Sequence, residues 1–507
     1  MDALAEHRRR ADALQYPRAW PDPVDSVELI ETHISTVLLG GDYAYKLKKP
    51  VNLGFVDFTR LDQRHYYCTE ELRLNRRLAP RVYLDVVAVT EDAAGPRFGD
   101  AARVVDWAVK MRRFPQSALL GKRAQNKVLE PDLIERLAAM LAGFHAGAPV
   151  ATDSYGAPER ITRRALENFE ALAHTFTTEE QEARLQRLYS WTQEAAQRLA
   201  PVFEQRRRQG HVRECHGDLH LDNIILWEGE LAAFDCIEFA PDLRWIDTAN
   251  DIAFTIMDLH FHAQPAAAHH LLNAYLENSG DYDALALIPF YSVYRALVRA
   301  KIDALLLEEH TAPETRRTTM ARMERYLALA EHLARPAPAA LVITYGVSGS
   351  GKSTAAQALV QRLGCIRLRS DVERRRLMGL GKHAPTGSTL DGGAYTREQT
   401  RQTYARLHML AGHVLAAGFV SVVDATFLDQ AQRRCFADLA KERNAKFVIL
   451  DLETSPAQLR ARLVQRRAAG RDVSEADLEV LEQQLQRREP LDASERKHAI
   501  TVLAEKL

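Results

Sequence analysis

A glycine-rich stretch at residues 346–354, Gly-Val-Ser-Gly-Ser-Gly-Lys-Ser-Thr, restricts the possible folds of this chain more than any other feature. It follows an apolar run, LVITYG at 341–346, and precedes a stretch with the spacing of a helix. Glycines in this pattern let a loop wrap around phosphate groups, with its N–H groups pointing inward at the start of a helix. The sequence therefore predicts a strand, a phosphate-binding loop and a helix.

The polar side chains of this loop have expected roles. Lys352 is expected to neutralise charge on the β- and γ-phosphates of a nucleotide, and the Ser353 hydroxyl is expected to ligate Mg²⁺. We expect ATP and Mg²⁺ as cofactors. The residues expected to bind the nucleotide are Gly346, Ser348, Gly349, Ser350, Gly351, Lys352, Ser353 and Thr354.

The rest of this half alternates apolar runs with helical spacing. Four further runs have the length of strands: 365–369, 419–425, 446–453 and 499–504. Strands that alternate with helices imply right-handed βαβ units and a parallel sheet. We therefore predict an α/β P-loop NTPase fold.

Charged residues lie where such a sheet binds its ligands. Asp424 ends one apolar run, where a carboxylate reaches Mg²⁺, and Asp371 follows another, where it would meet an acceptor hydroxyl. Helix capping is the alternative role for both. Arg462 and Arg466 fall one turn apart on a predicted helix and are expected to close over the phosphates as a lid, with a solvated basic face as the alternative.

These motifs resemble those of the small P-loop kinases of the gluconate-kinase, polynucleotide-kinase and zeta-toxin type, which are grouped as AAA-type kinases. The resemblance covers residues 341 to about 490, and the glycine-rich loop is its most specific part. It implies phosphorylation of a hydroxyl group. Motor-type ATPases share the loop, but the arginine-rich lid pattern favours a kinase.

A second stretch, HGDLHLDNIIL at 216–226, places Asp218 five residues before Asn223 and seventeen residues before Asp235. A hydroxyl nucleophile needs a carboxylate near its proton, and a nucleotide-bound Mg²⁺ needs an amide oxygen and a second carboxylate. The pieces NIIL and LAAF are expected to be short strands that bring Asn223 and Asp235 together. We therefore expect Asp218 to be the catalytic base, and Asn223 and Asp235 to hold Mg²⁺.

This second motif resembles the hallmark of the aminoglycoside and choline phosphotransferases, which have a protein-kinase-like fold. The positions that match are His216, Gly217, Asp218, Asn223 and Asp235. The resemblance also implies that Asp251 is a buried helix cap. After Asp235 the chain reads Cys-Ile-Glu rather than Phe-Gly, so the flip of that segment known in protein kinases is not expected.

The same resemblance implies a strand lysine paired with a helix glutamate. In YAYKLK, Lys46 and Lys48 share one face of a strand, so the alternation cannot choose between them, although the family spacing favours Lys46. Glu70 and Glu71 are both candidates for the partner, and Glu71 is favoured.

Composition changes near 335–340, RPAPAA, which suits a short stiff linker. We predict a bilobal α+β protein-kinase-like domain, a linker and the P-loop domain. The predicted bounds are 1–335 for the first domain (small lobe about 1–105, hinge about 106–115, helical lobe about 116–335), 336–340 for the linker and 341–507 for the second domain.

Charge and cysteine content narrow the range of partners. Lys plus Arg number 67 and Asp plus Glu number 68, so no overall positive field attracts nucleic acid or an anionic membrane. The five cysteines form no CxxC pair and no apolar run has the length of a membrane span, so we expect a cytoplasmic protein without a membrane anchor.

The whole chain resembles bacterial fusions of an aminoglycoside-phosphotransferase-family domain with an AAA-type kinase. We expect a bifunctional kinase that acts on hydroxyl groups of small polar metabolites, with sugars or sugar derivatives favoured. The alternatives are a nucleotide or polynucleotide 5′-hydroxyl kinase in the P-loop half, or one domain that only senses ATP. The sequence leaves the acceptor at each site and the oligomeric state open.

Overall fold

The structure is a computed structural model, and it describes most of residues 3–503. The residues in this range that it does not describe are Leu53, Phe55, 100–102, Thr177, 310–311, Ala337, His383, 385–395, Pro456 and 463–477. Packing divides the chain into two compact units. The first combines residues up to Val128 with Gly143–Glu167 and Ala196–Asp258, and the second combines Leu129–Ala142, Asn168–Ala195 and the residues from Leu259 onward.

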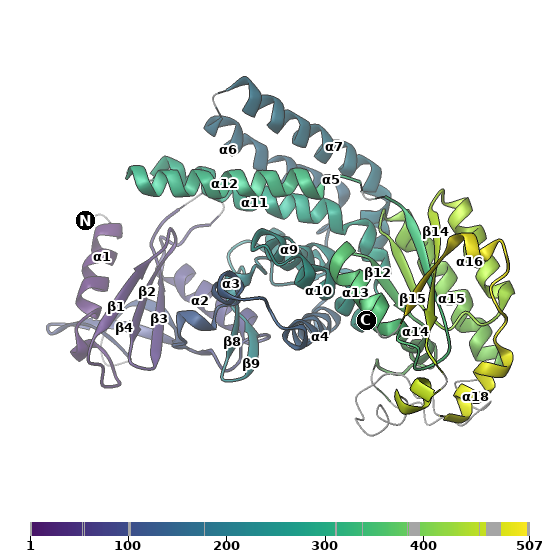
Figure 1. The fold of residues 1–507 in the computed structure, drawn as a ribbon. Helices are drawn as coiled ribbons and strands as arrows, with labels where there is room; N and C mark the ends of the chain where they lie inside the picture. The colour runs from purple at the N-terminus through teal and green to yellow at the C-terminus, as the bar shows by residue number, and fades with distance from the viewer. Residues whose placement is uncertain are drawn as a thin grey trace. The chain divides into compact units, whose positions relative to one another are not determined.

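The first unit contains a six-stranded antiparallel sheet, drawn in purple to blue in Figure 1. Its order is β1-β2-β3-β6-β4-β5, and helix α2 packs on β6 and β4. Alternating apolar side chains of these strands form the core, in which the rings of Tyr45 and Phe98 stack 3.9 Å apart. The bounds are β1 Val27–Glu31, β2 Ser35–Gly40, β3 Tyr43–Lys48, β4 Tyr83–Asp92, β5 Gly95–Phe98, β6 Arg103–Arg112, α1 Ala3–Leu14 and α2 Leu61–Asn75.

Two small antiparallel sheets complete the strands of this unit. One pairs β7 with β10, and the other is the hairpin of β8 and β9. Their bounds are β7 Val212–Glu214, β8 Ile224–Trp227, β9 Glu230–Ala233 and β10 Trp245–Asp247.

Helices make up most of residues 120–333. Boundaries between the two packing units fall within three of these helices, α4, α7 and α9. Their bounds are α3 Leu120–Asn126, α4 Pro131–Gly147, α5 Pro158–Leu166, α6 Asn168–Thr175, α7 Glu179–Arg208, α8 Pro241–Arg244, α9 Thr248–Phe261, α10 Pro265–Ser279, α11 Ile288–Glu309 and α12 Pro313–Leu333.

The second unit contains a five-stranded parallel sheet of order β12-β13-β11-β14-β15, drawn in green to yellow in Figure 1. Each strand coincides with a predicted apolar run, so the predicted parallel sheet is confirmed. The bounds are β11 Ala340–Tyr345, β12 Ile366–Arg369, β13 Ser421–Asp424, β14 Lys446–Glu453, β15 Ala499–Leu503, α13 Lys352–Leu363, α14 Ser370–Leu377, α15 Arg397–Ala416, α16 Gln430–Glu442 and α18 Leu478–Arg487.

Two features differ from what the sequence led us to expect. Most of the expected hinge, 106–115, is strand, because β6 continues to Arg112 and pairs with both β3 and β4. The boundary between packing units also does not coincide with the predicted linker at 336–340, since α10, α11 and α12 share a unit with the parallel sheet.

None of the helices that the structure describes combines the length and the apolar character that a membrane crossing requires.

Candidate active sites

The loop after β7 carries the first candidate site and depends on a glycine. Gly217 has a φ of +86°, and a Cβ there would lie 2.6 Å from the carbonyl oxygen of Leu243. Only glycine fits both the backbone conformation and this close approach. The chain therefore turns sharply before Asp218.

Asp218 and Asn223 lie together on this loop. The Nδ2 group of Asn223 donates to the backbone oxygen of Asp218 at 2.9 Å and to its Oδ2 at 3.1 Å. His220 Nε2 lies 3.4 Å from the same carboxylate. These contacts hold the carboxylate in a fixed orientation, while 33% of the Asp218 side chain stays exposed.

The β8–β9 hairpin brings Asn223 close to Asp235, as predicted. Ile224 pairs with Ala233, and the N–H of Phe234 donates to the backbone oxygen of Asn223 at 2.9 Å. Asp235 has a φ of +61°, a conformation that non-glycine residues rarely adopt. Such strain is concentrated at functional sites, where surrounding contacts maintain it.

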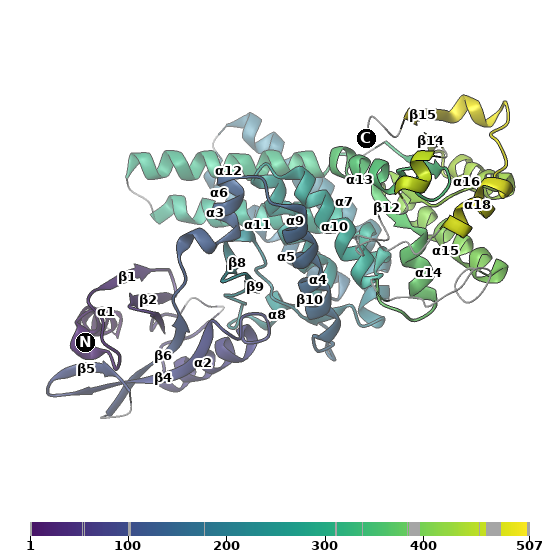
Figure 2. The same ribbon diagram turned by 60° about the horizontal axis from the view of Figure 1, so that its bottom comes forward.

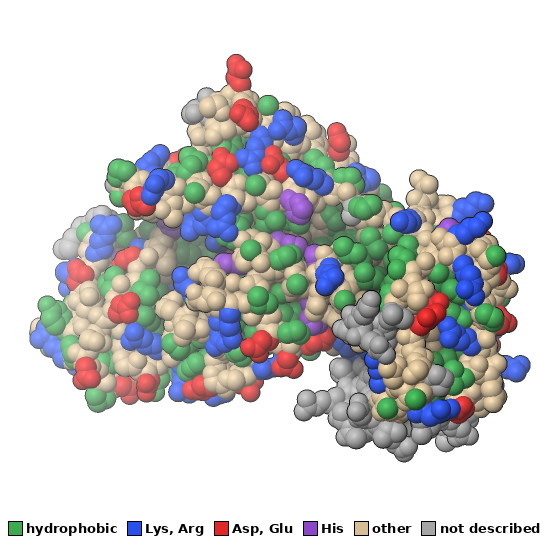
Figure 3. All heavy atoms as spheres, viewed as in Figure 1, with side chains coloured by type: hydrophobic (Ala, Val, Ile, Leu, Met, Phe, Trp, Pro, Cys, Tyr) green, Lys and Arg blue, Asp and Glu red, His purple; other side chains and the backbone are tan. Residues whose placement is uncertain are grey.

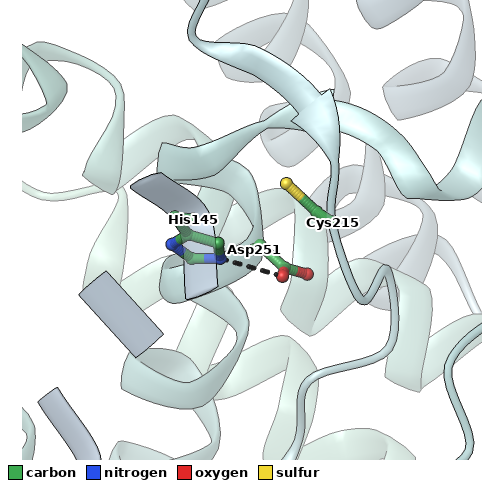
Figure 4. A group of neighbouring side chains, drawn as sticks. All are labelled: His145, Cys215 and Asp251. Atoms are coloured by element: carbon green, nitrogen blue, oxygen red, sulfur yellow. Dashed lines mark hydrogen bonds and ion pairs between the residues drawn. The ribbon is translucent and has the colours of Figure 1, made fainter. Parts of the chain in front are cut away.

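Asp251 braces the loop from beneath. Its Oδ1 accepts the N–H of Gly217 at 2.8 Å, and its Oδ2 accepts the N–H of His216 at 3.0 Å. His145 Nε2 lies 3.1 Å from Oδ2 (Figure 4). Asp251 lies inside α9 and binds the backbone of another segment, so the expected helix cap is instead a brace between segments.

The brace also explains a cluster with the makings of a metal site. The side chains of His145, Cys215 and Asp251 lie near one another (Figure 4), with ligand atoms within 4.8 Å of one another. Both oxygens of Asp251, however, already accept backbone N–H groups. Burial raises the pKa of Cys215 well above its usual value, which disfavours the thiolate that a metal needs. We assign this cluster a structural role.

Asp251→Asn is expected to lower the free energy of unfolding at pH 7 by about 2 kcal/mol. Burial alone would raise the pKa of Asp251, but the hydrogen bond and charge of His145 hold it at about 2. Because this value lies below the unfolded value of 3.8, the stabilisation is present above that pH and is lost as the pH falls toward 2. Chemical denaturation between pH 7 and pH 3 measures both effects.

Asp242→Asn is the matched control for this prediction. Asp242 pairs with Arg160 and Arg164 at 3.2 and 3.3 Å, but it is partly exposed, so its loss is expected to cost less than about 1 kcal/mol. An Asp251→Asn variant with the same acid dependence as the wild type would show that the carboxylate does not brace the loop.

Two lysines of β3 converge on one glutamate of α2. Lys46 Nζ lies 2.9 Å from Oε1 of Glu71, and Lys48 Nζ lies 2.7 Å from its Oε2. Lys46 also contacts Oδ1 of Asp235 at 2.5 Å, whereas Lys48 pairs with Glu238. Both lysines thus share one face of the strand, as its alternation predicts, and they differ in their second partner.

The two lysines differ in burial, and both carry charges that affect their neighbours. The Lys48 side chain is fully buried, whereas 13% of the Lys46 side chain is exposed. Burial alone would lower the pKa of Lys46, but the carboxylates of Asp235 and Glu71 raise it well above its usual value. Burial alone would raise the pKa of Glu71, but the two ammonium groups lower it to about 2.

The other glutamate candidate, Glu70, lies outside this cluster. It pairs with Arg73 at 2.9 Å, one turn along α2. Glu71 is therefore the glutamate that meets the lysines, and Glu70 belongs to a neighbouring network.

The glycine-rich loop between β11 and α13 forms the second candidate site. Gly346, Gly349 and Gly351 have φ values of +153°, +84° and +92°. A Cβ on Gly346 would lie 2.6 Å from Ser350 Oγ, a buried hydroxyl with no hydrogen-bond partner among the described residues. A cradle of glycines with an unsatisfied buried hydroxyl fits an anionic group such as phosphate.

The polar groups of this loop lie at the start of α13. Lys352 Nζ donates to the backbone oxygen of Val347 at 2.8 Å, and the N–H of Ser348 donates to Oε1 of Gln484 on α18 at 2.7 Å. Ser353 and Thr354 are exposed on the first turn of the helix.

Asp371 and Asp424 lie at the same edge of the parallel sheet as this loop. Asp424 is the last residue of β13, where it pairs with Arg369 of β12, and Asp371 lies in the first turn of α14, the helix that follows β12. The side chain of Asp371 accepts from Arg374 at 3.1 Å. Carboxyl ends of parallel strands form the ligand edge of such sheets.

The predicted lid is described only in part. Arg462 is half-buried in the helical segment 457–462, and Arg466 lies outside the described residues.

The sequence did not reveal three polar residues near these sites. In the sequence, Glu238 stood out only because it ends the unusual Cys-Ile-Glu after Asp235, and Arg367 only because it lies in an apolar run. Nothing in the sequence pointed to Gln484. Glu238 pairs with Lys48, Arg367 reaches the first turn of α13, and Gln484 binds the glycine-rich loop.

Comparison with known proteins agrees with this division into two sites. A family model described as "Phosphotransferase enzyme family" matches residues 55–288, and one described as "AAA domain" matches residues 341–491. The chain is therefore a kinase with a phosphotransferase domain of kinase-like fold followed by a P-loop domain. The resemblance, the fold class and the enzyme class predicted from the sequence are confirmed.

Relatives of the whole chain occur in mycobacteria. Uncharacterized proteins of Mycobacterium tuberculosis and Mycobacterium bovis are 30% identical over 450 residues, which is 88% of this chain and 88% of theirs. The chain belongs to the same family as these uncharacterized proteins.

Two solved structures are similar to parts of this chain. A choline/ethanolamine kinase family protein from Mesorhizobium loti has a TM-score of 0.38 and 13% identity, and it covers 64% of this chain and 99% of its own. A gluconokinase from Sinorhizobium meliloti 1021 has a TM-score of 0.24 and 20% identity, and it covers 34% of this chain and 85% of its own.

Proposed function

We propose that the chain is a bifunctional kinase that transfers the γ-phosphate of ATP, with Mg²⁺, to hydroxyl groups of small polar metabolites at two separate sites. Sugars or sugar derivatives are the acceptor class that we favour. The observation that supports this most is the ion pairing of Lys46 with both Glu71 and Asp235. In a kinase, this arrangement links the lysine that binds phosphate to the carboxylate that binds metal.

At the first site, Asp218 would accept the proton of the acceptor hydroxyl as its oxygen bonds to the γ-phosphorus and the bond from that phosphorus to ADP breaks. Asn223 uses its Nδ2 to hold Asp218, and its Oδ1 is the atom that a metal ion would take. Lys46 would bind the α- and β-phosphates, and Glu71 would orient it. Lys48, buried between Glu71 and Glu238, would support this arrangement.

At the second site, the residues 346–354 would bind the phosphates through their backbone N–H groups. The Ser353 hydroxyl and Asp424 would hold Mg²⁺, Lys352 would neutralise the γ-phosphate, and Asp371 would meet the acceptor hydroxyl. Arg462 and Arg466 would close over the transferred group. The bound metal supplies charge neutralisation at both sites.

The charge of the protein supports a small acceptor over a polynucleotide. The net charge is −1, and on the face drawn in Figure 3 the blue and red side chains are interspersed. A polynucleotide kinase would bind its substrate through a continuous basic surface, with strong salt dependence.

A metabolite-library phosphorylation assay on the wild type, Asp218→Asn and Lys352→Ala tests this function. Each variant is expected to lose one set of products and keep the other, because each removes a different site. Loss of the same product in both variants would contradict two independent activities, and no phosphorylated acceptor in any sample would contradict the assignment to small metabolites.

A further inference from the structure

Strand β12 lies at one edge of the parallel sheet, and helix α10 takes the place of a neighbouring strand there. Asn273 of α10 donates from Nδ2 to the backbone oxygen of Cys365 at 2.9 Å, and its Oδ1 accepts the N–H of Arg367 at 2.7 Å. One amide side chain thus makes the two hydrogen bonds that a strand would make there. Helix α10 also packs along α13, as both ribbon views show (Figures 1 and 2).

One turn further along α10, Glu277 forms ion pairs with three basic side chains at or near this edge of the sheet. Its carboxylate lies 3.2 Å from Nη2 of Arg367, 3.6 Å from Nη1 of Arg369 and 2.8 Å from Nζ of Lys382. Only 1% of the glutamate side chain is exposed. Burial alone would raise the pKa of Glu277, but the three cations lower it, so the group is anionic at neutral pH.

Arg367 extends this network to the glycine-rich loop. While Nη2 faces Glu277, its Nη1 donates to the backbone oxygen of Ser353 at 3.4 Å. Ser353 follows Lys352 directly and presents its hydroxyl on the first turn of α13. The guanidinium is nearly buried, so its two arms join α10 to that turn.

We propose that Arg367 is a positioning residue of the P-loop site, and that Asn273 and Glu277 of α10 fix it in place. This rests on the proposed function, in which the Ser353 hydroxyl ligates the metal of the nucleotide. Helix α10 lies within the segment matched by the phosphotransferase family, at 55–288, so part of that domain completes the nucleotide site of the other. Arg367 contacts the backbone of Ser353, whose hydroxyl is the proposed metal ligand. Loss of Arg367 is therefore expected to weaken the binding of metal-bound nucleotide.

Calorimetric titration of the full chain with ADP, in Mg²⁺ and in EDTA, tests the proposal. The P-loop component is the binding that Lys352→Ala weakens. Glu277→Gln and Arg367→Gln are each expected to weaken Mg²⁺–ADP binding at this component by about 10-fold or more. Binding of metal-free ADP is expected to change less than about 2-fold, because the glycine cradle itself is unaltered.

A double variant separates a shared path from two independent effects. Because Glu277 acts through Arg367, the double variant Glu277→Gln/Arg367→Gln is expected to bind Mg²⁺–ADP no more weakly than Arg367→Gln alone. Arg367→Lys keeps the charge beside Glu277 but loses the second arm of the guanidinium. If Arg367→Gln does not fold, binding is measured with Arg367→Lys instead. The same loss is expected for Mg²⁺–ADP, with little change for metal-free ADP.

Asp303→Asn is the matched control. Asp303 is a buried carboxylate of α11 in the same packing unit, paired with Arg322 of α12 at 2.5 Å and outside the proposed network. It is expected to bind both forms of ADP as the wild type does.

Three outcomes would overturn the proposal: an equal loss of both forms of ADP in the Glu277 and Arg367 variants, no loss in either, or a wild-type P-loop component that ignores Mg²⁺. If instead Lys352→Ala weakens no binding component, the proposed function of the loop itself fails, which is a different result.

Discussion

Replacing Asp218 by asparagine is expected to lower phosphate transfer at the first site by about 10²- to 10⁴-fold, the range typical of a lost general base. Asparagine has nearly the same shape and can still meet Asn223, which now lies 3.1 Å from the carboxylate. It cannot accept the proton of a hydroxyl group. The loss is therefore expected in kcat, while nucleotide affinity changes little.

Asp222→Asn is the control for this variant. Asp222 lies on the same loop, between His220 and Asn223, but it has no place in the proposed site. Product formation with Asp222→Asn is expected to stay near the wild-type rate. If Asp218→Asn raised KM and left kcat unchanged, Asp218 would be a binding residue and not the base.

Lys352→Ala is expected to weaken nucleotide binding at the second site by roughly 10- to 150-fold, which corresponds to a charged hydrogen bond of about 1.5–3 kcal/mol. Lys352 is nearly buried, and its Nζ group lies against its own loop, 2.8 Å from the oxygen of Val347. Binding at the first site should be unaffected. Titration with labelled ATP measures both.

Lys441→Ala on α16 is the matched control, because Lys441 is an exposed lysine of the same unit. It is expected to bind ATP as the wild type does. Equal binding by Lys352→Ala and Lys441→Ala would mean that the glycine-rich loop holds no phosphate.

The parallel sheet was predictable because each of its strands is a local signal. Buried strands of an α/β domain are short apolar runs between helical stretches, and the runs before and after 346–354 have this form. The antiparallel sheet was less visible. Residues 103–112 show no regular alternation and were expected to contain a hinge, and only the pairing with β3 and β4 identifies a central strand.

The candidate sites divide in the same way. The spacing of Asp218, Asn223 and Asp235 along the chain made them candidates, and the loop and hairpin bring them close together. Strand alternation placed Lys46 and Lys48 on one face but could not separate them, because their second partners, Asp235 and Glu238, lie about 190 residues away.

Contacts between distant segments had no signal in a single sequence. Glu277 and Arg367 are 90 residues apart and lie on opposite sides of the linker predicted from composition. Proline and alanine at 335–340 mark a change in composition, whereas the packing of α10 against β12 depends on buried charges that only the folded chain brings together.

The number of nucleotides that one chain binds tests the central claim most directly. Equilibrium dialysis of the full chain with saturating Mg²⁺–ADP is expected to give two equivalents per chain. Lys352→Ala is expected to bind one equivalent at a nucleotide concentration that saturates the wild type but lies below the Kd of the weakened site. Asp235→Ala is also expected to bind one equivalent. A single equivalent in the wild type, or one variant that removes both, would contradict two separate kinase sites.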